Sequence, residues 1–177
     1  MIDPVGWIPV PARKRVFFAT LVWTLALMAI SQVINAPLRT SSAPAGIVSF
    51  ELARTPANTQ AMIASWDARA QLFAAFGLGI DYLFMLSYAF TIALACLLAG
   101  GRQKGWFAAL CTWLGWGVFL AAALDAVENI ALWHSLLGPV SAPWPAISFW
   151  CASFKFGLIL LGIACGLIGW FLPKKNS

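Results

Sequence analysis

The chain contains 177 residues, of which 62% are hydrophobic and only 10% are charged, and its formal net charge is +5. A water-soluble domain carries about 25% charged residues, so this composition excludes a soluble globular protein and indicates an integral membrane protein. Most of the basic residues flank apolar stretches, which is typical of membrane topology, and we expect no nucleic-acid partner.

The first apolar segment, 16–36, directly follows a basic cluster at 13–15. Its 21 residues exceed the roughly 7–15 apolar residues of a secretory signal peptide, so we expect a membrane span rather than a cleaved leader. Near its outer end the segment carries the polar residues Ser31, Gln32 and Asn35. Pro37 follows at once and predicts the end of the helix.

The loop 37–74 is the longest stretch outside the predicted spans. Thr55 and Pro56 have the residue types preferred at the N-cap and the first position of a helix. Apolar residues then recur at helical spacing, namely Met62, Ile63, Trp66, Ala70 and Phe73. The pattern predicts an amphipathic helix in this loop that leads into the second span.

Three further segments, 75–99, 106–133 and 146–171, are apolar and exceed the roughly 20 helical residues that a bilayer core requires. All ten prolines lie outside the four segments, as expected because proline disrupts a helix interior. The sequence therefore predicts an all-α integral membrane protein, in which a single domain, 1–177, forms a four-transmembrane-helix bundle with one long outer loop.

The basic residues predict the orientation of the spans. Arg39, Arg54 and Arg69 flank one side, whereas the other side has seven cations: Arg13, Lys14, Arg15, Arg102, Lys104, Lys174 and Lys175. Because the side richer in Lys and Arg is usually cytoplasmic, we expect both termini inside the cell and the loops 37–74 and 134–145 outside. The predicted location is the cell membrane.

Four charged residues interrupt the predicted spans: Asp81, Asp125, Glu128 and Lys155. A charge in hydrocarbon is costly and is by default a candidate functional site. At 1.5 Å per residue, Lys155 and Asp125 lie about 12–13 Å below the outer end of their helices, Glu128 lies about 7 Å below it and Asp81 about 6–13 Å. Opposite charges at similar depth predict ion pairing.

Helical spacing extends this candidate site. Asn129 shares a face with Asp125 and Glu128, and Tyr88 shares a face with Asp81. Lys155 lies on a stripe with Gly162, Gly166 and Gly169, which is typical of a contact face between membrane helices. We therefore predict a polar cluster in the outer half of the bundle formed by Asp81, Tyr88, Asp125, Glu128, Asn129 and Lys155.

Neither a metal nor a cofactor is expected. His134, the one histidine, lies off the face of Asp125 and Glu128. The four cysteines, Cys96, Cys111, Cys151 and Cys165, all lie within predicted spans and have no CxxC spacing. This pattern favours small buried side chains over disulfide or redox chemistry.

The polar cluster allows several functions. The protein is expected to bind or carry an amphiphilic or lipid-like molecule, whose polar head would contact the charged residues. The alternatives are a membrane-embedded enzyme that uses a carboxylate as general acid or base on a lipid or isoprenoid, and an accessory subunit whose charges only join helices. No catalytic residue is assigned, and a homo-oligomer or a partner membrane protein stays open.

Overall fold

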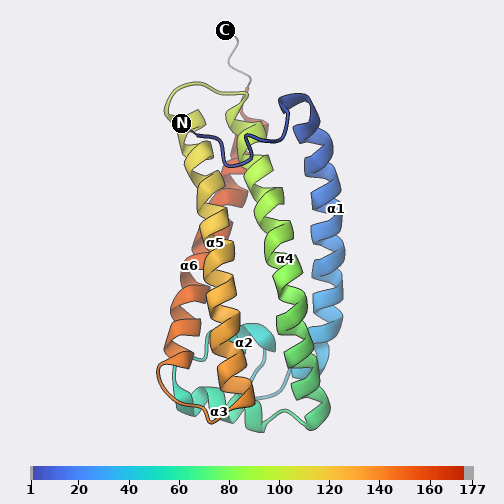
Figure 1. Cartoon of the computed structure of the whole chain (residues 1–177), viewed down its shortest axis with the longest axis vertical. Helices are drawn as coiled ribbons and strands as arrows, with labels where there is room; N and C mark the ends of the chain where they lie inside the picture. Colours follow the sequence, from blue (N-terminus) through green and yellow to red (C-terminus); the bar gives the residue numbers. More distant parts are fainter. Residues whose placement is uncertain (1, 174–177) are drawn as a thin grey trace. The chain divides into compact units, whose positions relative to one another are not determined.

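The computed structural model of the protein describes residues 2–173, and all regular secondary structure among them is helical. The four long helices, drawn in Figure 1, are α1 (Val10–Asn35), α4 (Ala68–Gly100), α5 (Trp106–Leu137) and α6 (Trp144–Phe171). Three short elements lie between α1 and α4: the 3-10 helix η1 (Ala36–Leu38), α2 (Ile47–Glu51) and α3 (Pro56–Ala64). Lys174 and Lys175 lie outside the described residues.

The four predicted spans correspond to these four long helices, each of which is long and apolar enough to cross a membrane. Three helices begin earlier than predicted: α6 by two residues, and α1 and α4 by a turn or more. In α1 the helix continues through the basic cluster, where Arg13 forms an ion pair with Asp3 at 2.5 Å. In α4 the helix begins after Asp67, whose carboxyl group accepts a hydrogen bond from the Ala70 amide at 2.7 Å and caps the first turn.

The helix expected between Thr55 and the second span is present only in part. Thr55 is the N-cap of α3, as predicted, and its side chain accepts a hydrogen bond from the Asn58 amide at 3.3 Å. However, α3 ends at Ala64, so the prediction that it leads into the second span was wrong. The Ser65 hydroxyl bonds to the Met62 carbonyl oxygen and replaces the next helical hydrogen bond, after which Asp67 starts a new helix.

The chain divides into two compact units. Unit 1 comprises the described residues of Met1–Leu25, Leu86–Ala123 and Lys155–Ser177, and unit 2 comprises Ala26–Met85 and Leu124–Phe154. Each long helix contributes one part to each unit.

In unit 1, the glycines of α6 pack directly on α4. A Cβ atom built on Gly162 would lie 2.7 Å from Ile92 Cγ2, and one built on Gly169 would lie 2.5 Å from Ala99 Cβ. Gly166 is similarly close to Ala95, at 3.1 Å. The predicted small-residue contact face is therefore confirmed, and it joins two helices of the same chain. Such close contact gains dispersion energy in a membrane, where lipid offers no hydrophobic drive for helices to associate.

Hydroxyl groups join α1 to α4 within unit 1. The Thr24 hydroxyl lies 2.6 Å from the Ser87 Oγ and 2.9 Å from the Thr91 Oγ1. Val5 and Ile8, which precede α1, pack with Leu94 in a small apolar cluster. The N-terminal part of α1 is thus held by polar contacts and by the segment before it.

Unit 2 has an apolar core made largely by the loop between α1 and α4. Trp66 is central, because its indole N–H donates to the Leu38 carbonyl oxygen at 2.8 Å and its ring contacts Phe50 edge to face. Leu78 from α4 and Leu132 from α5 complete the packing. Figure 1 shows α2 and α3 beside the unit 2 parts of α4 and α5.

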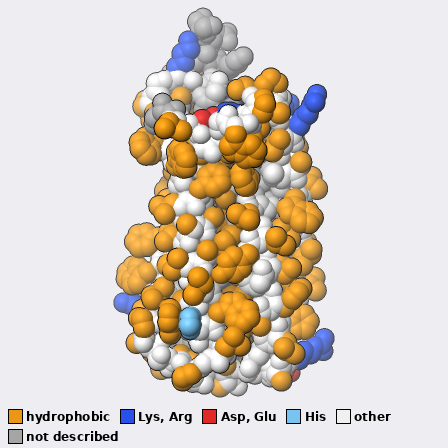
Figure 2. Space-filling model, viewed as in Figure 1, with side chains coloured by type: hydrophobic (Ala, Val, Ile, Leu, Met, Phe, Trp, Pro, Cys, Tyr) orange, Lys and Arg blue, Asp and Glu red, His pale blue; other side chains and the backbone are white. Residues whose placement is uncertain are grey.

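The exterior of the long helices is apolar. Hydrophobic side chains predominate on the face drawn in Figure 2, and α1 alone exposes Val22, Trp23, Leu25 and Met28. Soluble monomers rarely expose apolar patches of this extent. Together with the four long apolar helices, this surface indicates a membrane-embedded protein.

The glycine contact predicts different effects for two substitutions in α6. Gly169→Ala should lower the melting temperature in detergent, because overpacking against Ala99 costs about 1–3 kcal/mol. Gly157→Ala is the matched control, since a Cβ atom there meets nothing within 4 Å, and should leave stability unchanged or raise it by up to about 1 kcal/mol. Thermal unfolding followed by tryptophan fluorescence measures both, and equal effects would contradict the contact.

Candidate functional site

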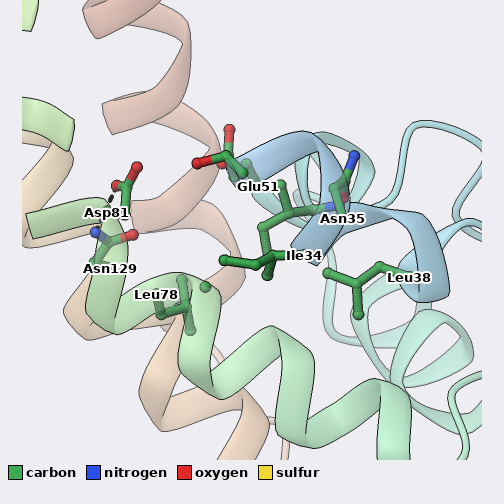
Figure 3. Close-up of a pocket in the computed structure, with 10 residues that line it drawn as sticks. Ile34, Asn35, Leu38, Glu51, Leu78, Asp81 and Asn129 are labelled. Atoms are coloured by element: carbon green, nitrogen blue, oxygen red, sulfur yellow. Dashed lines mark hydrogen bonds between the residues drawn. The ribbon is translucent and has the colours of Figure 1, made fainter. Parts of the chain in front are cut away.

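A cavity of about 60 Å³ lies within unit 2, between parts of α1, α2, α4 and α5. Figure 3 shows its lining. The apolar part of the wall consists of Ile34, Leu38, Ile47, Gly77 and Leu78. The polar part consists of Ser31, Asn35, Glu51, Asp81 and Asn129. A polar cavity of this kind is unusual in helices that are otherwise so apolar, and it is the candidate functional site.

Asp81 and Asn129 form one wall of the cavity. The Asn129 amide Nδ2 donates a hydrogen bond to Asp81 Oδ2 at 2.8 Å and joins α5 to α4. Asn129 is buried and Asp81 is half-buried. The amide therefore fixes the orientation of the carboxyl group at the cavity, as a hydrogen-bonded neighbour does for a binding residue.

Asn35, the last residue of α1, lines another part of the cavity and fixes the backbone of the loop beside it. Its Nδ2 donates to the Ala45 carbonyl oxygen at 3.2 Å, and its Oδ1 accepts from the Ile47 amide at 2.7 Å. Between these two bonds lies Gly46, at a φ of 64°, and a Cβ atom there would collide with the Asn35 side chain. Glycine is thus required twice, by the backbone conformation and by the contact.

The turn at Gly46 starts α2, and α2 carries Glu51 to the cavity. The backbone at this end is fixed by Ser148 of α6, whose hydroxyl donates to the Glu51 carbonyl oxygen at 2.9 Å. Figure 3 shows the carboxyl groups of Glu51 and Asp81 on facing sides of the cavity. Two carboxyl groups from segments distant in the sequence therefore converge on one small space.

Hydrogen-bond acceptors dominate the chemistry of this space. The two carboxyl groups can only accept hydrogen bonds when they are ionised. The two side-chain amides and the Ser31 hydroxyl can both donate and accept. One water occupies about 10–15 Å³ on this measure, so 60 Å³ holds a few water-sized groups. The cavity can accept a small group that donates hydrogen bonds, such as an amine, a hydroxyl or water.

The structure distributes the six predicted site residues over both units. Asp81 and Asn129 meet at the cavity. Asp125 and Glu128 are buried in unit 2 and belong to α5, but they are outside the cavity lining. Tyr88 and Lys155 are buried in unit 1, and the Lys155 Nζ lies 5.0 Å from the centre of the Phe156 ring.

Each of these charged side chains makes a contact within the protein. The pairing of Lys155 with the carboxylates stays a prediction. Arg69, in the first turn of α4, lies over the Phe73 ring, with its guanidinium carbon 5.7 Å from the ring centre.

Sequence reasoning missed the cavity residues outside α4 and α5. Ser31 and Asn35 carried a usable signal, since two polar residues at i and i+4 share one face of an apolar helix. Glu51 carried none, because its position depends on the turn at Gly46. Within residues 2–173 no group of three or more His, Cys, Asp or Glu side chains could hold a metal ion. His134 lies in the last turn of α5, stacked on Trp144 with ring centres 4.1 Å apart.

The contact between Gly46 and Asn35 predicts a specific loss of stability. Gly46→Ala and Gly105→Ala both place a side chain at a positive φ, 64° and 73°, which costs about 1–3 kcal/mol. Only Gly46→Ala also displaces the Asn35 amide, because Gly105 has open space around it, and the broken buried hydrogen bonds add about 1–3 kcal/mol. Gly46→Ala should therefore melt several degrees lower than Gly105→Ala in thermal unfolding, and an equal melting temperature would contradict this role of Asn35.

The chain matches no protein-family model, no curated protein and no solved structure. A fold shared with a known protein would in any case leave the function to be argued from the site. The function proposed below therefore rests on the residues around the cavity and on the apolar surface of the helices.

Proposed function

We propose that the protein binds an amphiphilic, lipid-like molecule and holds its polar head in the unit 2 cavity. The observation that carries this proposal is the cavity of Asp81, Glu51, Asn35 and Asn129 within helices whose exterior is apolar. An amphiphile has the same division, with one polar end and one apolar body. Membrane lipids are always present around such helices, so the ligand class is available to the protein wherever it is embedded.

The size of the cavity limits which part of the ligand it receives. Sites that enclose a whole drug-sized molecule have volumes of about 300–1,000 Å³, whereas this cavity has about 60 Å³. Only a small head group fits, and the apolar body would lie along the hydrophobic surface of the helices. The protein thus acts as a binding or carrier protein that encloses only the head group of its ligand and not the complete lipid.

The acceptor-rich lining favours a head group that donates hydrogen bonds. An amine or a cluster of hydroxyls would bond to the carboxyl groups of Asp81 and Glu51, and a charged partner strengthens such bonds. A phosphate or carboxylate head would instead be repelled by the same oxygen atoms. We infer an amine-bearing or hydroxyl-bearing amphiphile as the ligand.

Substitutions at two glycines of α4 test the proposal. Gly77 lines the cavity, whereas a Cβ atom on Gly79 meets nothing within 4 Å. Gly77→Leu should reduce the amphiphile that copurifies in mild detergent at least tenfold, because its side chain occupies the cavity, and Gly79→Leu should retain it. Asp81→Asn keeps the shape and should weaken binding about tenfold, equivalent to 1.4 kcal/mol. Native mass spectrometry measures the bound fraction in each variant.

Two outcomes would contradict the proposed function. One is wild-type protein that carries no amphiphile in native mass spectra under gentle detergents. The other is an equal loss of bound amphiphile in Gly77→Leu and Gly79→Leu, since a ligand outside the cavity would respond to both substitutions alike.

We further propose that both termini lie in the cytoplasm and that α3 is an amphipathic helix at the outer surface of the cell membrane. The distribution of cations supports this orientation. Apart from Lys155, the described cations of unit 1 are Arg13, Lys14, Arg15, Arg102 and Lys104, whereas unit 2 has only Arg39, Arg54 and Arg69. In α3 the buried Thr59 and the half-buried Met62 and Ile63 share one face, and Asn58 is exposed.

Cysteine labelling tests this orientation. Asn58 and Lys104 are both exposed, so a membrane-impermeant maleimide should label Asn58→Cys in intact cells and Lys104→Cys only after permeabilisation. The unsubstituted protein is the control, because its own cysteines lie within the long helices. The reverse labelling pattern would overturn the proposed topology.

A further inference from the structure

Three cysteines from three helices meet in unit 1. The Cys111 Sγ of α5 lies 2.8 Å from the Cys165 Sγ of α6. Cys96 of α4 donates to the Gly162 carbonyl oxygen at 3.3 Å and also interacts with Cys165. All three are buried, as the sequence predicted, but the absence of CxxC spacing concealed that they are neighbours.

Small residues bring these thiols together. A Cβ atom on Gly100 would lie 2.9 Å from Cys111 Cβ, so the glycine lets the start of α5 approach the end of α4. Gly162, one turn before Cys165, allows the equally close contact between α6 and α4. The cysteines therefore lie where glycines let the three helices approach one another closely, and their positions are set by the backbones of these helices.

We propose that Cys111 and Cys165 are a redox modification site that forms a disulfide between α5 and α6. The two sulfur atoms already touch, and a disulfide, with an S–S bond of about 2.05 Å, requires only a small further movement. The two residues are 54 positions apart in the chain, so the bond would tie the two helices together covalently. Neither cysteine takes part in the cavity of unit 2, and this proposal is independent of the proposed function.

The burial of the two thiols limits which oxidants can reach them. Cys111 is 0% and Cys165 is 4% exposed, so a charged or bulky disulfide reagent cannot reach either sulfur. Hydrogen peroxide is small and uncharged and can enter. One thiol attacks a peroxide oxygen, so that an S–O bond forms, the O–O bond breaks and one water leaves, which gives a sulfenic acid. The second thiol attacks that sulfur, the S–S bond forms and a second water leaves.

The two steps balance. The pair of thiols loses two hydrogen atoms, that is two protons and two electrons, and hydrogen peroxide is reduced to two molecules of water. Cys165 also interacts with Cys96, but Cys111 is the proposed partner because its Sγ lies 2.8 Å from that of Cys165. Cys96 stays a thiol, held by its bond to the Gly162 carbonyl oxygen.

Counting free thiols tests the proposal in the full-length protein in lipid nanodiscs. The protein is treated with hydrogen peroxide, denatured and alkylated with N-ethylmaleimide, and its intact mass is measured. The unoxidised chain should carry four adducts, one for each cysteine, and the oxidised chain should carry two. Dithiothreitol should restore four, and peptide mapping of the oxidised wild-type protein should yield a linked peptide that contains Cys111 and Cys165.

Cysteine variants locate the bond. In Cys111→Ser and Cys165→Ser the disulfide cannot form, so each should keep three adducts after peroxide or, where the remaining thiol stops at the sulfenic acid, carry two adducts and one added oxygen atom. The controls Cys96→Ser and Cys151→Ser should fall from three adducts to one, because Cys151 lies in unit 2 and Cys96 is not the partner. The proposal is overturned by four adducts on the peroxide-treated wild-type protein, by a linked peptide containing Cys96 or Cys151, or by a bond between two chains. Peptide mapping of the oxidised wild-type protein tests the proposal even if a cysteine variant fails to fold.

Discussion

The hydrogen bonds of Asn35 are the interaction on which the candidate site depends. A buried amide must satisfy its donors and its acceptor within the protein, because an unpaired polar group in an apolar environment costs about 1–3 kcal/mol. Asn35 does so by bonding to the backbone of Ala45 and Ile47 on either side of Gly46. The chain after α1 is thereby folded back, and Glu51 reaches the cavity opposite Asp81.

The core of unit 2 follows from the same turn. Trp66 and Phe50 pack together only because the loop returns to α4, and the indole N–H then satisfies the carbonyl oxygen of Leu38. Unit 2 therefore resembles the interior of a soluble protein, with large side chains and a closed network of backbone hydrogen bonds. In the wall of the cavity, Asn35 is hydrogen-bonded to the loop, and Asp81 and Asn129 are hydrogen-bonded to each other, which lowers the cost of polar groups at this place.

Unit 1 is held together by a different principle. Its contacts are short and involve small residues, glycines of α6 against alanines of α4, and hydroxyls between α1 and α4. Close approach of backbones compensates for the missing hydrophobic drive in lipid. The cysteine cluster is compatible with this packing, since thiols are small enough to lie where three helices converge.

Much of this architecture could be predicted from the sequence. Apolar length and proline position sufficed for the four long helices, and Thr55 with Pro56 located the start of α3. The spacing of Gly162, Gly166 and Gly169 correctly indicated a helix contact. These signals depend only on residues close together in the sequence, so they can be recognised without knowledge of the fold.

The remaining features depend on contacts between distant segments. The end of α3 at Ala64 depends on the Ser65 and Asp67 side chains competing with the backbone, which helical periodicity does not reveal. Glu51 and the pair Cys111 and Cys165 were missed because a turn or a helix contact brings them to their partners. Asp81 was selected for its cost in hydrocarbon and Asn129 for sharing a helical face with Asp125 and Glu128. These two criteria identified one wall of the cavity but not the other.

The unequal burial of the helices bears on how the protein is assembled during synthesis. In the most apolar stretch of α1 only 11% of the residues are buried inside the protein, against 61% in α4. Since α1 emerges from the ribosome before the other helices, its insertion must rely on its own contact with lipid. The helix α4 contacts α1 but is not fully shielded until α5 and α6 arrive, so membrane insertion and helix association are separable stages for this chain.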